Sequence, residues 1–154
     1  MEEKFMRMAI DLAVENVHNG GGPFGAVIVK DGEIVATGVN RVTSHNDPTA
    51  HAEVSAIRAA CEKLGTFMLD GCTIYSSCEP CPMCLGAIYW AHIDRLVYGA
   101  NKHDAADAGF DDSFIYKELE IDPSQRRLLT STLLPEDAKR AFEAWKNNTD
   151  RIDY

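Results

Sequence analysis

Residues 72–90 of the chain read CTIYSSCEPCPMCLGAIYW. The stretch opens with a strand-like run, Cys72 to Ser76, and continues after Glu79-Pro80 as an apolar helix from Cys81 to Trp90. Proline is favoured in the first turn of a helix, because the N–H that it lacks would have no intrahelical partner there. We therefore predict a strand that leads directly into a helix.

The flanking sequence continues this alternation of helices and strands. The other expected elements are a helix through Phe5 to Val17, strands at Phe24 to Lys30 and Glu33 to Val39, a helix at Ala50 to Leu64 that stops at Gly65, and a strand at Arg95 to Ala100. Asp31-Gly32 predicts a tight hairpin, because both residue types tolerate positive φ. A hairpin followed by alternating helices and strands implies an α/β fold in which helices sandwich a mixed sheet.

The C-terminal third gives weaker signals. Asp104 to Glu118 predicts a loop and a short helix, Arg127 to Thr132 a late strand, and Pro135 to Asn147 a last helix. No linker, repeat or low-complexity stretch divides the chain, and 154 residues is about the length of one domain. We therefore expect a single domain over residues 1–154.

Composition and charge narrow the class of ligand. The chain carries 15 Lys and Arg residues against 24 Asp and Glu residues, a net charge of −9. Nucleic-acid binding requires a positive surface that replaces phosphate counterions, so a small neutral ligand fits better than a polynucleotide. No apolar run reaches the ~18 residues of a membrane helix, and Met1-Glu2-Glu3-Lys4 lacks the layout of a signal peptide. We expect a cytoplasmic protein without nucleic-acid or membrane partners.

Three potential zinc ligands stand at the starts of two predicted helices: His51, Cys81 and Cys84. The two-residue gap in Cys-x-x-Cys places both thiols on one helical turn, as a tetrahedral metal requires. The positive end of the helix dipole lowers thiol pKa values, so both cysteines can bind as thiolates. Three protein ligands leave one position open, which is the layout of a catalytic rather than a structural zinc site.

Glu53 follows His51 by two residues and is placed to act on whatever occupies the open position. Zinc lowers the pKa of water towards ~7 and makes it a usable nucleophile. A carboxylate beside that water can take its proton and deliver it to a ring nitrogen and then to a leaving amine.

Two other interpretations of the cysteines remain open. Cys81 and Cys84 alone could form a redox pair, although this leaves His51 and Glu53 unexplained. Cys78, three residues before Cys81, could close a structural zinc site as a fourth ligand.

Four stretches carry a specific resemblance that spans nearly the whole chain. They are GGPFGAVIVKDG (21–32), NDPTAHAE (46–53), SCEPCPMCLGAIYW (77–90) and AGFDDSFIY (108–116). His-x-Glu followed by Pro-Cys-x-x-Cys is the pattern of zinc nucleobase deaminases. The chain resembles the zinc-dependent cytidine-deaminase-like superfamily and, within it, the small bacterial guanine deaminases. The first three stretches are shared with transfer-RNA adenosine and cytosine deaminases, whereas the Gly-Phe-Asp-Asp block and the aromatic tail point to guanine.

The resemblance implies a role for each site residue. His51, Cys81 and Cys84 would bind one Zn²⁺ per subunit, and Glu53 would shuttle protons. The implied substrate-binding residues are Phe24, Asn40, Trp90, Asp112 and Tyr154. Phe24 and Trp90 would stack on the purine, and Asn40 would form a hydrogen bond with its edge. Asp112 would face the 2-amino group and assist catalysis there. Independently, a carboxylate such as Asp112 would suit the N–H donors at N1 and N2 of guanine, and aromatic faces suit a planar base.

The family resemblance also implies a fold and an assembly. We expect a three-layer α/β/α sandwich around a five-stranded mixed sheet, in a homodimer that exchanges the C-terminal segment from about residue 135 to 154. Tyr154 could then serve the partner's pocket. The expected reaction is hydrolysis of guanine to xanthine and ammonia.

Several alternatives for the function stay open. They are deamination of guanosine, cytosine or cytidine, a transfer-RNA adenosine deaminase, against which the charge of −9 weighs, and a non-catalytic zinc-binding module.

Overall fold

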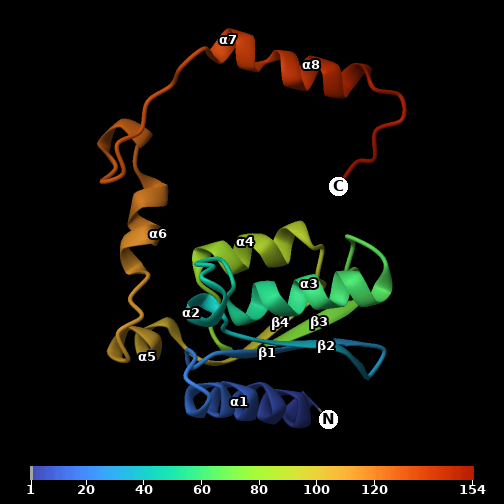
Figure 1. The fold of residues 1–154 in the computed structure, drawn as a ribbon, viewed down its shortest axis with the longest axis vertical. Coiled ribbons are helices and arrows are strands. Elements are labelled where there is room, and N and C mark those ends of the chain that lie inside the picture. Colours follow the sequence, from blue (N-terminus) through green and yellow to red (C-terminus); the bar gives the residue numbers. More distant parts are fainter. Residues whose placement is uncertain (1) are drawn as a thin grey trace. The chain divides into compact units, whose positions relative to one another are not determined.

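The computed structural model describes residues 2–154 of the chain (Figure 1). The chain divides into two compact units, the first ending at Asp112 and the second running from Ser113 to Tyr154. Within residues 2–154, no helix is long and apolar enough to cross a bilayer.

The first unit is built on one mixed sheet of four strands in the order β2-β1-β3-β4. The strands are β1 (Gly25–Lys30), β2 (Glu33–Val39), β3 (Cys72–Cys78) and β4 (Arg95–Ala100). β1 pairs antiparallel with both β2 and β3, and β3 pairs parallel with β4. The predicted hairpin is confirmed: Asp31 and Gly32 both adopt positive φ, 50° and 76°, between β1 and β2.

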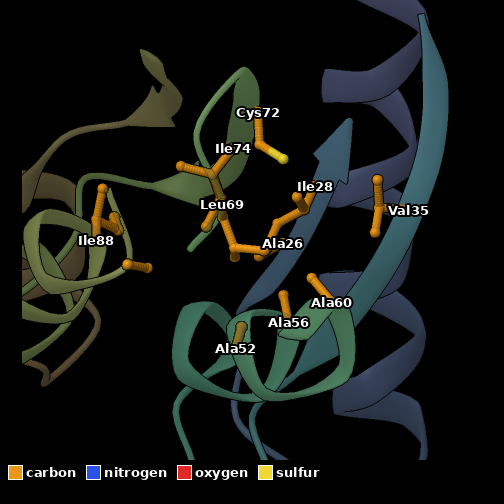
Figure 2. Close-up of a cluster of buried hydrophobic side chains, with 11 residues drawn as sticks. Ala26, Ile28, Val35, Ala52, Ala56, Ala60, Leu69, Cys72, Ile74 and Ile88 are labelled. Atoms are coloured by element: carbon orange, nitrogen blue, oxygen red, sulfur yellow. The ribbon is translucent and has the colours of Figure 1, made fainter. Parts of the chain in front are cut away.

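Helices cover both faces of this sheet, which gives the three layers expected from the sequence (Figure 1). α1 (Glu2–His18) lies on one face, where Phe5 and Ala9 pack against Val27, Val29 and Tyr75. The other face carries α3 (Ala52–Leu64) and α4 (Pro82–Trp90), with the short α2 (Val42–His45) before α3. Figure 2 shows the alanines of α3 against alternate residues of β1 and β3 (Ala26, Ile28 and Ile74).

Two glycines in the hairpin let the helices approach the sheet closely. A β-carbon at Gly25 would lie 2.4 Å from the carbonyl oxygen of Ala9 on α1. A β-carbon at Gly38 would lie 2.3 Å from the carbonyl oxygen of Ala52 on α3. The helix start that carries His51 and Glu53 therefore rests directly on the backbone of β2.

The chain after β4 is helical and largely exposed. α5 (Lys102–Asp107) still belongs to the first unit and begins at an Asn101 capping box. The second unit comprises α6 (Ser113–Glu120), a 3₁₀ turn (Pro123–Gln125), α7 (Pro135–Ala138) and α8 (Arg140–Asn147). None of residues 113–154, all of which the structure describes, is buried. The single last helix expected over Pro135 to Asn147 is therefore two helices, separated at Lys139.

The expectation of five strands is wrong for the described residues, which form four. The fifth strand was expected at Arg127 to Thr132, where the chain is irregular and forms no strand. Local hydrogen bonds hold this region instead: Arg126 Nε donates to the Glu118 carbonyl at 2.8 Å, and the Arg127 N–H donates to the Glu118 carboxylate at 2.9 Å. An apolar run specifies a strand only where a neighbouring edge can take its backbone groups.

Candidate metal and catalytic site

The three candidate metal ligands meet where α3 and α4 begin. His51 is the N-cap of α3 and Cys81 the N-cap of α4, both with extended backbones. The helix expected to open at Glu79-Pro80 and to run from Cys81 begins instead at Pro82, which occupies its first turn. Cys84 lies in the same turn and is buried. Two helix N-termini therefore direct their partial positive charges to one place, which favours thiolate ligands.

The distances between these ligand atoms suit a tetrahedral zinc ion. His51 Nδ1 lies 3.5 Å from Cys81 Sγ and 3.5 Å from Cys84 Sγ. Typical Zn–N and Zn–S bonds at the tetrahedral angle would place nitrogen and sulfur about 3.6 Å apart. All three ligand atoms lie within 4.8 Å of one another, so His51, Cys81 and Cys84 fit one metal ion without rearrangement.

The electrostatics of the cluster favour a charged Cys81. The Cys84 thiol and His51 both bond to the Cys81 sulfur, and they lower its pKa to about 4. The same contact with Cys81 raises the pKa of His51, and it raises the pKa of the Cys84 thiol, which acts as the donor. The cluster therefore contains a thiolate near neutral pH even before a metal binds.

Glu53 lies in the first turn of α3 with only 5% of its surface exposed. Its Oε1 accepts a hydrogen bond from the buried hydroxyl of Ser76 on β3 at 2.8 Å. Glu53 is also an electrostatic neighbour of Cys84, where it raises the thiol pKa. Glu53, the expected proton carrier, thus lies beside the metal ligands and is held by Ser76, which is not part of the zinc-binding sequence motif.

Phe24 and Asn40 lie close together at the start of β1 and the end of β2. The Asn40 N–H donates to the Phe24 carbonyl at 3.3 Å, and the Asn40 Oδ1 accepts from the Val42 N–H at 3.2 Å. The side-chain amide of Asn16 on α1 donates to the carbonyls of Gly22 and Asn40 at 2.8 and 2.9 Å. Asn16 was not among the site residues singled out in the sequence, and the structure shows that its side chain fixes these loops.

Phe24 has an aromatic neighbour that sequence reasoning did not single out. Phe110 packs edge-on against it, with ring centroids 5.0 Å apart. Both rings line an apolar pocket of about 590 Å³, together with residues of α1 and α5 and with Cys78. Phe110 lies in the Gly-Phe-Asp-Asp block, so this block is the sequence feature that could have indicated it.

Asp112 ends the first unit and is half-buried. Burial raises its pKa, and the negative charges of Cys81, Asp111 and Glu79 raise it further. Cys81, one of the candidate metal ligands, is thus among the charges that act on Asp112, and the role of Asp112 at a substrate stays a prediction.

Trp90 lies at the opposite end of α4 from the metal ligands, and Tyr154 belongs to the second unit. Trp90 is the last residue of α4 and is 68% exposed, about 9 Å along the helix axis from Cys84 at 1.5 Å per residue. Tyr154 is exposed in the second unit, where its ring packs edge-on against Trp145 at 6.4 Å. Their roles at a substrate therefore stay predictions.

Cys78 does not join the metal cluster. Among residues 2–154, the ligand atoms that gather are those of His51, Cys81 and Cys84. The Cys78 thiol is buried and donates to the Asn101 carbonyl at 3.7 Å. Burial, followed by the charge of Glu53, raises its pKa to about 11, so it is a poor thiolate ligand. This geometry argues against a closed four-ligand site.

Comparison with known proteins identifies the family. The family model described as the cytidine and deoxycytidylate deaminase zinc-binding region matches residues 1–100. The chain belongs to this family. The matched residues include the candidate ligands His51, Cys81 and Cys84, and the family is defined by zinc binding in this region.

The relatives of this chain include both guanine deaminases and tRNA-specific adenosine deaminases. Guanine deaminase from Bacillus subtilis is 54% identical over 153 residues, which cover 99% of this chain and 98% of that protein. Its X-ray structure matches with a TM-score of 0.97 over 100% of this chain and 99% of the other. The tRNA-specific adenosine deaminase of Agrobacterium fabrum is 45% identical over 107 residues, 68% of this chain and 70% of that protein.

A third relative is more distant. The structure of guanine deaminase from Nitrosomonas europaea is 35% identical, covers 73% of this chain and 65% of the other, and has a TM-score of 0.69. The likeness to the Bacillus subtilis enzyme thus extends over the second unit, whereas the likeness to these other two relatives covers only part of the chain.

Proposed function

We propose that this protein is a guanine deaminase that hydrolyses guanine to xanthine and ammonia, with one zinc ion held by His51, Cys81 and Cys84. The observation that carries the proposal is a three-ligand cluster with Glu53 beside it, in a chain 54% identical along 99% of its length to a guanine deaminase. Imidazole and thiolate ligands favour zinc over harder cations.

The proposed reaction forms a C2–O bond from water and breaks the bond between C2 and the exocyclic amine. A bound zinc ion would supply Lewis acidity that makes water nucleophilic near neutral pH. Glu53 carries the first proton of the water to N3 of the ring and the second to the departing amine, which leaves as ammonia. Its burial keeps bulk water from competing for these protons.

Substrate recognition is assigned to residues around the cluster. Asp112 accepts from the N–H groups on the 2-amino side of guanine and assists at the leaving amine; its place near Cys81 supports this. Phe24 stacks on the base, supported by the backbone hydrogen bond that joins it to Asn40, the residue assigned to the purine edge. Asn40 bonds the purine edge through a side chain already oriented by Val42. Trp90 is assigned as a second stacking ring.

We also propose a single functional domain that works as a homodimer with exchanged C-terminal segments, in which Tyr154 completes the partner's site. The support is the exposed apolar surface of the segment: Leu133 is 85%, Phe142 67% and Ile152 67% exposed. Apolar side chains in such numbers are typical of a surface that packs against another subunit.

The proposal is tested by ammonia release from guanine, guanosine, adenine, cytosine and cytidine with the zinc-loaded protein. We expect turnover of guanine and its loss in Glu53→Ala. Turnover of guanosine, cytosine or cytidine instead would keep the zinc–glutamate mechanism and overturn the assignment of guanine. If none of the five substrates released ammonia, the proposed deaminase activity would be wrong.

A second candidate has a specific observation in its favour. Several relatives at 41–45% identity are tRNA-specific adenosine deaminases. The net charge of −9 argues against a polyanionic substrate. Inosine formation in tRNA that falls steeply with added salt would support this candidate, whereas a salt-insensitive rate on the free base excludes it.

A further inference from the structure

The hydroxyl of Ser76 donates a hydrogen bond to the carboxylate of Glu53, to which the thiol of Cys84 also bonds. Its Oγ lies 2.8 Å from Glu53 Oε1, and the two residues are 1% and 5% exposed. Ser76 belongs to β3, in the middle of the sheet, and faces Ala26 of β1 in the strand register. Neither the motif of the zinc ligands nor the proposed mechanism uses it.

The position of Ser76 makes a polar side chain unexpected there. Cys72, Ile74 and Ser76 alternate along β3 and point to the face covered by α3, and the first two are fully buried in the apolar core. A buried hydroxyl without a partner costs free energy, so an apolar residue would be the ordinary choice at this position. The hydrogen bond to Glu53 explains why a serine occupies this position.

The geometry points to a role in orienting the carboxylate. A glutamate side chain has three rotatable bonds, and a group that transfers protons must be held close to its productive geometry. A bond from Ser76 fixes Oε1. Cys84 also bonds to Glu53 as a thiol, but it has no proton to donate once it binds zinc as a thiolate, so Oε2 is then the oxygen that exchanges protons. The donor comes from the rigid centre of the sheet, whereas Glu53 comes from the first turn of a helix.

We propose that Ser76 is a positioning residue that holds Glu53 in its proton-transfer orientation. The proposal rests on the proposed function for its kinetic consequence, because Glu53 must be the proton carrier for its orientation to affect the rate. The structural consequence, a change in the conformation of Glu53, does not depend on the substrate.

The decisive comparison is Ser76→Thr against Ser76→Val, because threonine and valine have nearly the same shape and differ in the hydroxyl. We expect Thr to keep kcat within about twofold and Val to lower it at least tenfold, since small misplacements of a catalytic group lower rates by one to two orders of magnitude. KM for guanine and the zinc content should stay near those of the wild type in both variants. Ser76→Ala, with less volume than valine, serves if Val does not fold.

A matched control is Ser77→Ala on the same strand. Ser77 is also buried, but its hydroxyl accepts from the Gly25 N–H at 3.0 Å and so serves the sheet rather than Glu53. We expect this variant to lower the melting temperature without the loss of kcat. A drop in kcat equal to that of Ser76→Val would mean that any lost buried hydroxyl slows the enzyme, which would overturn the proposal.

A second readout is independent of activity: crystal structures of the zinc-loaded wild type, Ser76→Thr and Ser76→Ala. We expect one conformation of Glu53 in the first two proteins and a rotated or split carboxylate in Ser76→Ala. An unchanged Glu53 in Ser76→Ala together with an unchanged kcat would overturn the inference. If the wild type releases no ammonia from guanine, the proposed function fails, and the conformation of Glu53 alone decides the role of Ser76.

Discussion

Glu53 is a buried carboxylate beside the metal-ligand cluster, and it accepts hydrogen bonds from the Ser76 hydroxyl and the Cys84 thiol. A group in this position costs stability unless it is partnered, so its presence is explained best by chemistry. We expect Glu53→Gln to keep the fold and the zinc but to lower kcat by about 10²–10⁴-fold, the usual contribution of general acid–base catalysis. Ammonia release and metal analysis measure the two effects.

The control for this substitution lies on the same helix. Glu62, near the C-terminal end of α3, is exposed, so Glu62→Gln removes the same charge away from the site. We expect it to retain full activity. If Glu53→Gln lost zinc together with activity, the loss of zinc would explain the loss of activity. Glu53 would then stabilise the metal site, and the experiment would give no support to its role in proton transfer.

The thiols of the metal-free protein should differ in reactivity with pH. The pKa of Cys81 is lowered to about 4 by its bonds to Cys84 and His51, whereas burial raises that of Cys78 to about 11. Between pH 5 and 8 Cys81 is therefore a thiolate and Cys78 a thiol, and the thiolate is the nucleophile. We expect iodoacetamide to label Cys81 at pH 6, with Cys78 unlabelled and Cys81 protected by added zinc. Mass spectrometry of the labelled peptides measures this; labelling of Cys81 that begins only above pH 8 would contradict it.

At the scale of elements, the approach of α3 to the hairpin carries the metal ligand His51 and Glu53 to their places. A β-carbon at Gly38 would lie 2.3 Å from the Ala52 carbonyl oxygen and 2.5 Å from the Ala56 N. We expect Gly38→Ala to push the helix start outward, to lower stability by about 3 kcal/mol and to weaken zinc binding. Urea denaturation and competition with a chelator measure these two effects.

Gly86 on α4 provides the opposite case. Nothing outside its own helix backbone lies within 4 Å of a β-carbon built there, among the described residues. Replacing a glycine inside a helix by alanine stabilises by about 0.5–1 kcal/mol, so Gly86→Ala should raise stability. If both alanine variants were equally destabilised, the close approach at Gly38 would not be the cause.

Elements with strong local signals could be predicted from the sequence. The Asp31-Gly32 turn and the Gly65 end of α3 are confirmed, because each depends on backbone preferences of one or two residues. The helix expected from Cys81 to Trp90 is present but begins at Pro82, two residues after the proline that was expected to open it. The motif likewise predicted the cluster of His51, Cys81 and Cys84, since spacing on a helix start fixes the ligand positions. The strand predicted at Arg127 to Thr132 is wrong, because a strand needs a pairing partner from elsewhere in the chain, and local sequence does not encode that partner. Ser76 and Asn16 were missed because their partners, Glu53 and Asn40, are distant in sequence.

At the scale of the whole molecule, the two units differ in what holds them. The first has a core on both faces of its sheet, whereas no residue of 113–154, a range described throughout, is buried. Helices as short as α7 and α8 are marginal in water without tertiary packing. A partner subunit is the simplest source of that packing, and this is the physical basis of the proposed exchange.

Exchange of the C-terminal segment can be tested by mixing two inactive variants, Glu53→Ala and a chain lacking Tyr154. In an exchanged dimer, one of the two sites of the mixed dimer combines an intact Glu53 with the intact Tyr154 of the other chain, so activity returns. If Tyr154 serves its own chain, every site of the mixed dimer carries one defect and the mixture stays inactive. We expect about one quarter of wild-type activity after co-refolding of equal amounts, because half of the dimers are mixed and half of their sites are intact. Recovery must be absent when either variant is refolded alone, and light scattering must give the mass of a dimer; a monomer at working concentration would contradict the exchange outright.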